Sequence, residues 1–150
     1  MAHRLSSELA SGFAEMDGQH GALLQRLDAA LEAVRSDSLA TTKRALQDLG
    51  DYLLAHFAEE EKFMAAAAYP ERSRHKSAHD LFIQDFVQLT RELDVMGLSI
   101  PVAEWITTRV PEWLKFHIQV NDIPLGRFLS ARRFNPESGA PSCTSKPRAR

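Results

Sequence analysis

The chain has 150 residues, of which 44% are hydrophobic, and a formal net charge of −2, enough for one compact core but without a strongly basic surface for nucleic acid. Its N-terminal residues lack the apolar stretch of a secretory signal, and no segment approaches the roughly 18 apolar residues that a membrane helix needs. Because Cys143 is the only cysteine, an internal disulfide is excluded, and we expect a cytoplasmic domain that binds neither nucleic acid nor membrane.

Four segments of the chain have apolar residues at helical spacing, and the first two of them precede Tyr69-Pro70. We expect the first helix to begin near Asp17, which can cap it, and to end before Ser36. The second helix is predicted from about Leu39 to Ala68, where Tyr69-Pro70 closes it.

The third helix is predicted to have Pro70 or Glu71 near its first turn and to stop at Gly97, which suits a left-handed cap. The fourth starts at about residues 99–101. Pro111 lies inside the fourth helix, where it removes a backbone hydrogen bond and should kink or break the helix. Short connections between long helices predict an all-α fold, an up-down-up-down antiparallel four-helix bundle.

We predict that residues 1–134 form this bundle domain, with an N-terminal arm before the first helix and a last turn or two after Pro124. Residues 135–150 contain Pro, Ser and Arg without apolar periodicity, so a disordered tail is expected there. The small positive charge of this tail could contact an unknown protein partner, although a solvated tail is the simpler interpretation.

Seven residues with metal-binding side chains recur on the inward stripes of the predicted helices. Two pairs, His56 with Glu60 and His75 with His79, are four residues apart, so a helix projects both members of a pair from one face. The third pair, His117 and Asp122, is five residues apart, which corresponds to about 140° around a regular helix. These two side chains can share a centre only near a helix end or a distorted turn. Pro124 fits such an ending. The full set is His20, His56, Glu60, His75, His79, His117 and Asp122.

A single histidine on an apolar face is more often a core residue than a metal ligand. The whole set is different, because five imidazoles and two carboxylates buried without a metal would leave too many polar groups unsatisfied. The sequence therefore predicts a dinuclear metal site that spans four helices. These ligand types suit iron, zinc, manganese or copper, so they leave the metal open. The Glu-x-x-His motif of ferritin-like di-iron proteins and the His-Glu-x-x-His motif of zinc proteases are both absent.

The motifs around these residues closely resemble those of the hemerythrin family, in particular its bacterial single-domain form. The matching motifs are Asp17-Gly18-Gln19-His20, His56-Phe57-Ala58-Glu59-Glu60, Tyr69-Pro70, His75-x-x-x-His79 and Trp113-Leu114-Lys115-Phe116-His117-Ile118 with Asp122. The resemblance covers residues 5 to 130 approximately and includes all seven ligand positions. Leu5, where bacterial members often carry tryptophan, and Pro111 depart from the pattern of the family.

The resemblance implies two non-haem iron ions joined by an oxo or hydroxo bridge. One iron would be held by His75, His79 and His117, and the other by His20 and His56. The two carboxylates, Glu60 and Asp122, would bridge the two ions. This ligand set leaves one coordination position open, on the iron with two histidines, and there the family implies that dioxygen binds.

The function implied by the resemblance is reversible dioxygen binding for carriage, storage or delivery. We expect a monomer that is not an enzyme. Four apolar residues beside the ligands, Leu24, Phe57, Trp113 and Leu114, are expected to line the oxygen pocket and to exclude water. Two alternatives remain open. One is an oxygen or redox sensor whose partner would contact the tail, and the other is a di-iron protein that handles peroxide or nitric oxide, which a wetter pocket near Pro111 would favour.

Overall fold

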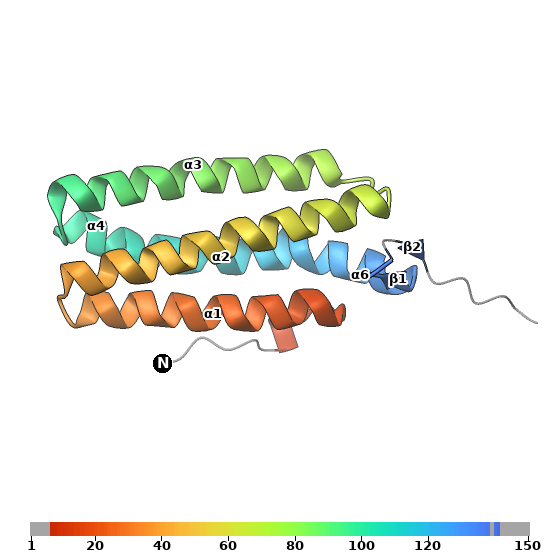
Figure 1. Ribbon diagram of the computed structural model, residues 1–150, viewed down its shortest axis with the longest axis horizontal. Helices are drawn as coiled ribbons and strands as arrows, with labels where there is room; N and C mark the ends of the chain where they lie inside the picture. The colour runs from red at the N-terminus through yellow and green to blue at the C-terminus, as the bar shows by residue number, and fades with distance from the viewer. Residues whose placement is uncertain (1–6, 139, 142–150) are drawn as a thin grey trace, which may run out of the picture.

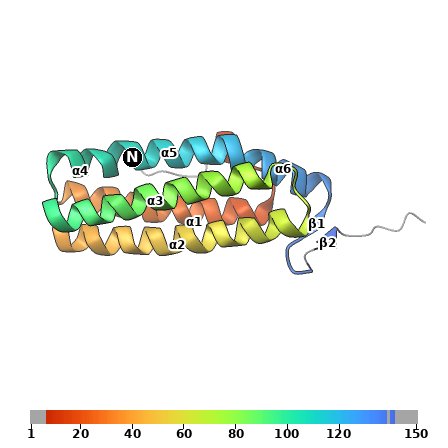
Figure 2. The same ribbon diagram turned by 90° about the horizontal axis from the view of Figure 1, so that it is seen from above.

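Four helical rods lie side by side in the computed structural model, which describes residues 7–138 and 140–141 (Figures 1 and 2). Leu5 and Cys143 lie outside the described residues, as does most of the expected tail. Three rods are single helices, and the fourth is a continuous helical run built from three α-helices joined by two π-helical segments. The elements are α1 (Ala14–Arg35), α2 (Leu39–Ala66), α3 (Arg72–Met96), α4 (Ile100–Glu104), η2 (Trp105–Arg109), α5 (Val110–His117), η3 (Ile118–Asp122) and α6 (Ile123–Ala131).

Consecutive rods run in opposite directions, so the predicted up-down-up-down antiparallel bundle is confirmed (Figure 1). The starts of α2 and of the fourth rod follow from side-chain caps. The Ser38 hydroxyl accepts a hydrogen bond from the backbone N–H of Thr41, and the Ser99 hydroxyl accepts one from Val102. Gly97 ends α3 with a φ of 62°, a conformation that favours glycine. No helix among the described residues is long and apolar enough to cross a membrane.

Asp17 is not the cap of the first helix, because α1 already begins at Ala14. Its carboxylate instead holds the preceding arm, accepting hydrogen bonds from the backbone N–H and the hydroxyl of Ser11, both at 2.8 Å, and from the N–H of Gly12 at 3.1 Å. The arm also contains the 3-10 helix η1 (Ser7–Leu9). Three donors to one carboxylate in the first helical turn fix how the chain enters the bundle.

Pro111 and Pro124, inside the fourth rod, neither break it nor end it, so the predicted break at Pro111 and the predicted ending at Pro124 are wrong. Each follows a π-helical turn, in which the N–H of Val110 bonds to the carbonyl of Trp105 and the N–H of Ile123 bonds to that of Ile118. A proline ring clashes with the carbonyl four residues earlier and has no N–H to donate. In a π-helical turn each backbone N–H bonds to the carbonyl five residues earlier, so the turn is wider than in an α-helix. This wider turn accommodates Pro111 and Pro124 within a continuous helix.

Two short strands that pair with each other follow α6, at the start of the segment that was expected to be a disordered tail. Strand β1 (Phe134–Asn135) pairs antiparallel with β2 (Ala140–Pro141), with Phe134 opposite Pro141. The Phe134 ring is buried against Phe13 and Phe63, and this burial attaches β1 to the bundle. Residue 139 and residues 142–150 of the expected tail lie outside the described residues.

The core has two apolar clusters with a layer of polar side chains between them. The larger cluster includes Leu23 on α1, Phe57 on α2 and Leu114 on α5. The smaller one, at the end of the bundle near the arm, contains Phe13, Met16, Phe63, Met64, Leu125, Leu129 and Phe134. On α1, His20 falls between Met16 of the smaller cluster and Leu23 of the larger one. On α2, His56 and Glu60 fall between Leu53 of the larger cluster and Phe63 of the smaller one. The fold therefore places these polar groups in the interior, where water does not reach them.

Candidate metal centre

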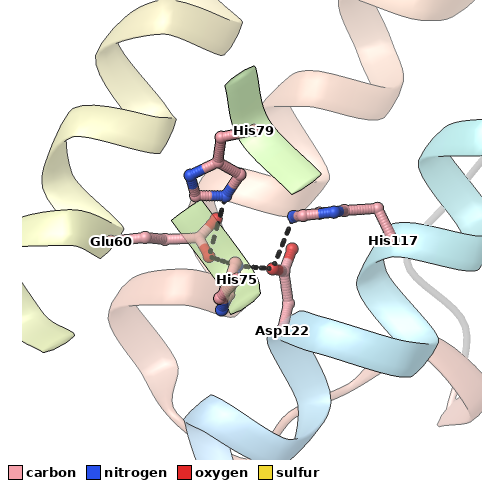
Figure 3. A group of neighbouring side chains, drawn as sticks. All are labelled: Glu60, His75, His79, His117 and Asp122. Atoms are coloured by element: carbon pink, nitrogen blue, oxygen red, sulfur yellow. Dashed lines mark ion pairs between the residues drawn. The ribbon is translucent and has the colours of Figure 1, made fainter. Parts of the chain in front are cut away.

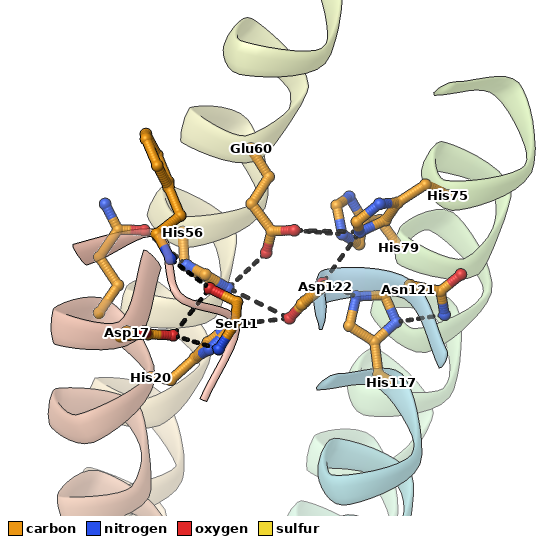
Figure 4. A network of polar contacts seen from close by, with 12 residues as sticks. Ser11, Asp17, His20, His56, Glu60, His75, His79, His117, Asn121 and Asp122 are labelled. Carbon is orange, nitrogen blue, oxygen red and sulfur yellow. Dashed lines mark hydrogen bonds and ion pairs between the residues drawn. The ribbon is translucent and has the colours of Figure 1, made fainter. Parts of the chain in front are cut away.

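All seven side chains that the sequence singled out meet at one place in the bundle (Figures 3 and 4). Every rod contributes at least one of them, and each is at most 3% exposed. The contributions are His20 from α1, His56 and Glu60 from α2, His75 and His79 from α3, His117 from α5 and Asp122 from η3.

The seven residues form two overlapping groups, in each of which the potential ligand atoms lie within 4.8 Å of one another. One group adds His75, His79 and His117 to the two carboxylates, and the other adds His20 and His56. Glu60 and Asp122 belong to both groups. The geometry is that of two adjoining sites that share two carboxylates.

Each carboxylate directs one oxygen to each group of histidines. Glu60 Oε1 contacts His56 Nε2, and Glu60 Oε2 lies 3.0 Å from His75 Nε2. Asp122 Oδ2 lies 2.8 Å from His20 Nε2. The other oxygen, Asp122 Oδ1, lies 3.0 Å from His75 Nε2 and 3.1 Å from His117 Nε2. This division of oxygens suits two cations bridged by both carboxylates.

The π-helical segment η3 explains how His117 and Asp122 reach one centre. It begins directly after His117 and ends at Asp122. Because hydrogen bonds in a π-helix join residues five apart, these two residues stand about one turn apart and face the same way. The distorted turn that the five-residue spacing predicted is present. Pro124 follows this turn and does not end the helix.

Burial and mutual contact shift the pKa values of the groups in the centre in different directions. Burial alone would lower the pKa of His56, but Glu60 and Asp122 raise it to about 10. Burial also opposes protonation of His75, whose pKa is raised to about 9 by its close contacts with the carboxylates of Asp122 and Glu60. Burial lowers the pKa of His79 to about 3, an effect to which the charges of His75 and His117 add.

The two carboxylates remain ionised despite complete burial. Burial raises the pKa of Glu60, as does the charge of Asp122, but the attraction of His56 and His75 outweighs both, and the net shift is downward. The pKa of Asp122 is well below its ordinary value because its contacts with His117, His20 and His56 outweigh burial. Two carboxylates facing protonated His56 and His75 give a nearly neutral cluster in the metal-free protein.

Several ligand atoms of the cluster are buried without a hydrogen bond in the described part of the chain. They include Nε2 of His56, His75, His79 and His117, both oxygens of Glu60 and Oδ1 of Asp122. Buried polar atoms without hydrogen bonds are costly, so an arrangement that brings this many of them together is typical of a site for a ligand. Imidazole nitrogens and carboxylate oxygens are donors for transition-metal cations. The residues present therefore fit a metal centre.

Three further side chains contact the outward-facing ring nitrogens of the histidines. Gln19 Oε1 lies 2.6 Å from His56 Nδ1, Glu61 Oε1 lies 3.5 Å from His79 Nδ1, and Asn121 Nδ2 lies 3.3 Å from His117 Nδ1. Such outer contacts hold a ring in place and set which nitrogen carries the hydrogen. Sequence reasoning did not identify these residues. The only local signal is that each is adjacent in the chain to a residue of the centre.

Two of the four apolar residues expected to line an oxygen pocket stack on histidine rings. Phe57 stacks on His79 with ring centroids 4.0 Å apart, and Trp113 stacks on His117 at 4.7 Å. Leu24 and Leu114 are buried in the same cluster as Phe57. Phe57 also lines a cavity of about 420 Å³ between α2 and α3, whose wall includes Leu53, Phe82 and Phe86. Phe57 thus contacts His79 and also lines this cavity.

Comparison with known proteins gives a consistent result. Residues 11–123 match the sequence profile described as the hemerythrin HHE cation binding domain. The chain is 33% identical over 123 residues to a bacteriohemerythrin of Pseudomonas paraeruginosa, covering 81% of this chain and 78% of that protein. It is 27% identical over 115 residues to a bacteriohemerythrin of Stenotrophomonas maltophilia, covering 77% and 73%. A hemerythrin-like protein of Naegleria gruberi is 30% identical over 117 residues, covering 78% and 85%. The chain belongs to the hemerythrin family of metal-binding proteins.

Proposed function

We propose that this protein binds dioxygen reversibly at a non-haem di-iron centre, and that it carries, stores or delivers oxygen rather than acting as an enzyme. The observation that carries the proposal is the division of the carboxylate oxygens, since Glu60 and Asp122 each face both groups of histidines. Family membership and the name bacteriohemerythrin of several relatives support it.

In this proposal His75, His79 and His117 hold one iron, His20 and His56 hold the other, and Glu60 and Asp122 bridge them. Two ferrous ions, when bound, would supply two electrons to dioxygen and one open coordination position on the side with two histidines. The protein contributes the rigid placement of the donors, which come from four packed rods. Because no donor is more than 3% exposed, the bundle also keeps bulk water away from the centre.

The apolar residues around the centre are proposed to protect the oxygen-bound form. Leu24, Phe57 and Leu114 are at most 3% exposed, and Trp113 covers the face of His117. Water admitted here would promote loss of the reduced oxygen and leave the iron oxidised. Reversible binding therefore depends on these side chains as much as on the ligands.

The first experiment is a visible absorption spectrum of protein loaded with ferrous iron without air, exposed to dioxygen and then purged, with iron counted per chain. A charge-transfer band that appears with dioxygen and disappears on purging, at two irons per chain, is the expected result. Irreversible oxidation at two irons per chain would argue against reversible binding and favour redox sensing or peroxide chemistry.

Replacing Leu114 by alanine should retain the iron and hasten autoxidation, because the cavity left beside His117 admits water. The matched control is Leu49→Ala, an equally buried leucine two turns before His56 in the same apolar cluster. Both variants should lose about 2–5 kcal/mol of stability. We expect only the first to shorten the lifetime of the oxygen-bound form, on the order of tenfold. Equal lifetimes of the oxygen-bound form in the two variants would show that Leu114 does not line the oxygen pocket.

A further inference from the structure

His56 in one group of histidines and His79 in the other have outer hydrogen-bond acceptors of different charge. On one side of the carboxylates, His56 Nδ1 lies 2.6 Å from the amide oxygen of Gln19. On the other side, His79 Nδ1 lies 3.5 Å from a carboxylate oxygen of Glu61 (Figure 4 shows the two histidines on opposite sides of Glu60 and Asp122). One acceptor is neutral and the other is an anion.

Both rings turn their other nitrogen towards the centre. His56 Nε2 contacts Glu60 Oε1, and His79 Nε2 lies 3.9 Å from Glu60 Oε2. With Nε2 facing inward, Nδ1 carries the hydrogen and donates it to the outer acceptor. The identity of that acceptor then controls how much electron density the ring can give through Nε2.

We propose that Glu61 and Gln19 are positioning residues that make the two halves of the centre electronically unequal, the half containing His79 holding the more easily oxidised metal. A carboxylate that accepts the Nδ1 hydrogen makes the imidazole a stronger donor, whereas an amide oxygen does so much less. The inference rests on the proposed di-iron function, because it describes how these residues would act on bound iron.

The surroundings of Glu61 are consistent with an anion held in place beside His79. Its side chain is 32% exposed, and Lys76 Nζ lies 3.9 Å from the same Oε1 atom. Lys76 is more closely bound to Asp80, at 3.0 Å, so it neutralises Glu61 only in part. Glu61 thus keeps a negative charge directed at the ring, and it comes from the same helix as His56 and Glu60.

The test compares two substitutions with opposite expected effects in the iron-loaded protein. Glu61→Gln should raise the reduction potential of the centre, and Gln19→Glu should lower it. Each change should alter the oxidation equilibrium on the order of tenfold, which corresponds to about 59 mV for one electron. A residue with a merely structural role would not move the potential in opposite directions in the two variants.

Matched controls separate the outer contacts from a general change of charge. Glu59→Gln removes a negative charge from the same helix, at a side chain without an ion pair or hydrogen bond in the described part of the chain. Gly18→Glu adds a charge next to Gln19, at a position where an added Cβ meets no atom within 4 Å. We expect both controls to shift the potential less than half as far. The inference would be overturned if the controls shifted the reduction potential as far as the test variants do. It would also be overturned if both test variants shifted the potential in the same direction.

A second readout does not depend on iron. In the metal-free protein, nitrogen-15 NMR of the His79 ring should show the hydrogen on Nδ1, and Glu61→Gln should weaken this preference while leaving His56 unchanged. An unchanged His79 signal would overturn the inference. If the wild-type chain holds two irons and both test variants behave like their controls, the inference fails while the proposed function stands. If the wild-type chain holds no iron, the proposed function fails on its own account.

Discussion

At the scale of single residues, charge balance explains how this core tolerates its polar side chains. Glu60 and Asp122 are completely buried and ionised, and the raised pKa values of His56 and His75 supply protons that neutralise them. His79 remains neutral because burial and the neighbouring histidines lower its pKa to about 3. A metal that binds here must displace the protons on His56 and His75, so metal binding is coupled to pH.

The stability of the metal-free protein should be greatest near pH 6.5. The raised pKa values of His56, about 10, and His75, about 9, contribute stability that is complete below 6.5 and lost as the pH rises through 9 to 10. The lowered pKa of His79, about 3, costs stability as the pH falls from 6.5, because the unfolded chain takes up a proton that the folded one refuses. The lowered pKa values of Glu60 and Asp122 contribute stability above their ordinary values of 4.5 and 3.8, which is lost as the pH falls further.

Urea unfolding of the metal-free protein at pH 5, 6.5 and 10 would measure this dependence. We expect the midpoint to be highest at pH 6.5 and lower at both other values. In the Glu60→Gln variant the alkaline loss should be smaller, because the amide no longer raises the pKa of His56. A midpoint that is unchanged between pH 6.5 and 10 would contradict the charge balance described for the cluster.

At the scale of elements, the arm before α1 is held between two helices. Asp17 on α1 binds Ser11 and Gly12, and the Ser130 hydroxyl donates a hydrogen bond to the carbonyl of Gly12 at 3.1 Å. Ser11 also packs directly on Gly126 of α6, where an added Cβ would lie 2.3 Å from Ser11 Cβ. Only glycine at position 126 permits this approach of arm to helix.

Replacing Gly126 by alanine should therefore destabilise the protein by about 1–3 kcal/mol, because the arm or α6 must move. The matched control is Gly21→Ala in α1, where the added Cβ meets no atom within 4 Å. That change should stabilise the protein by about 0.5–1 kcal/mol, since alanine suits a helix interior better than glycine. Denaturant unfolding of both variants provides the measurement. Equal effects of the two substitutions would contradict the tight contact with Ser11.

At the scale of the whole molecule, the metal centre joins all four rods. On α1 and α2 its donors lie between residues of the smaller apolar cluster and residues of the larger one. The donors come together only in the folded chain, because they are spread from residue 20 to residue 122. A metal that binds this assembled site and not the unfolded chain stabilises the entire bundle.

Iron loading should raise the midpoint of thermal unfolding, and removal by a chelator should reverse the rise. At a free metal concentration one hundred times the dissociation constant, the gain is about 2.7 kcal/mol, on the order of 5–10 °C for a chain of this size. The Glu60→Ala variant should show a much smaller rise and fewer than two irons per chain. Scanning calorimetry with iron analysis would provide both measurements. Two irons per chain in that variant would contradict the bridging role of Glu60.

The sequence alone determined the bundle and the members of the candidate centre, because both follow from local spacing. Apolar residues at helical intervals predict the four rods, and spacings of four residues place His56 with Glu60 and His75 with His79 on common faces. The five-residue spacing of His117 and Asp122 predicted a distorted turn, which η3 provides. Helix periodicity is a property of neighbouring residues, so it can be read without knowing how the helices pack.

Only the tertiary structure decided how these side chains meet. The direction of each Glu60 oxygen, the contacts of Gln19 and Glu61 with histidines of other helices, and the binding of the arm by Asp17 all depend on the register between helices. The continuation of the fourth rod past Pro124 has the same origin, because α6 gains its burial from Leu125 and Leu129 in the smaller cluster. The register between helices is set by the packing of side chains that are distant in the chain, so it cannot be predicted from the spacing of neighbouring residues.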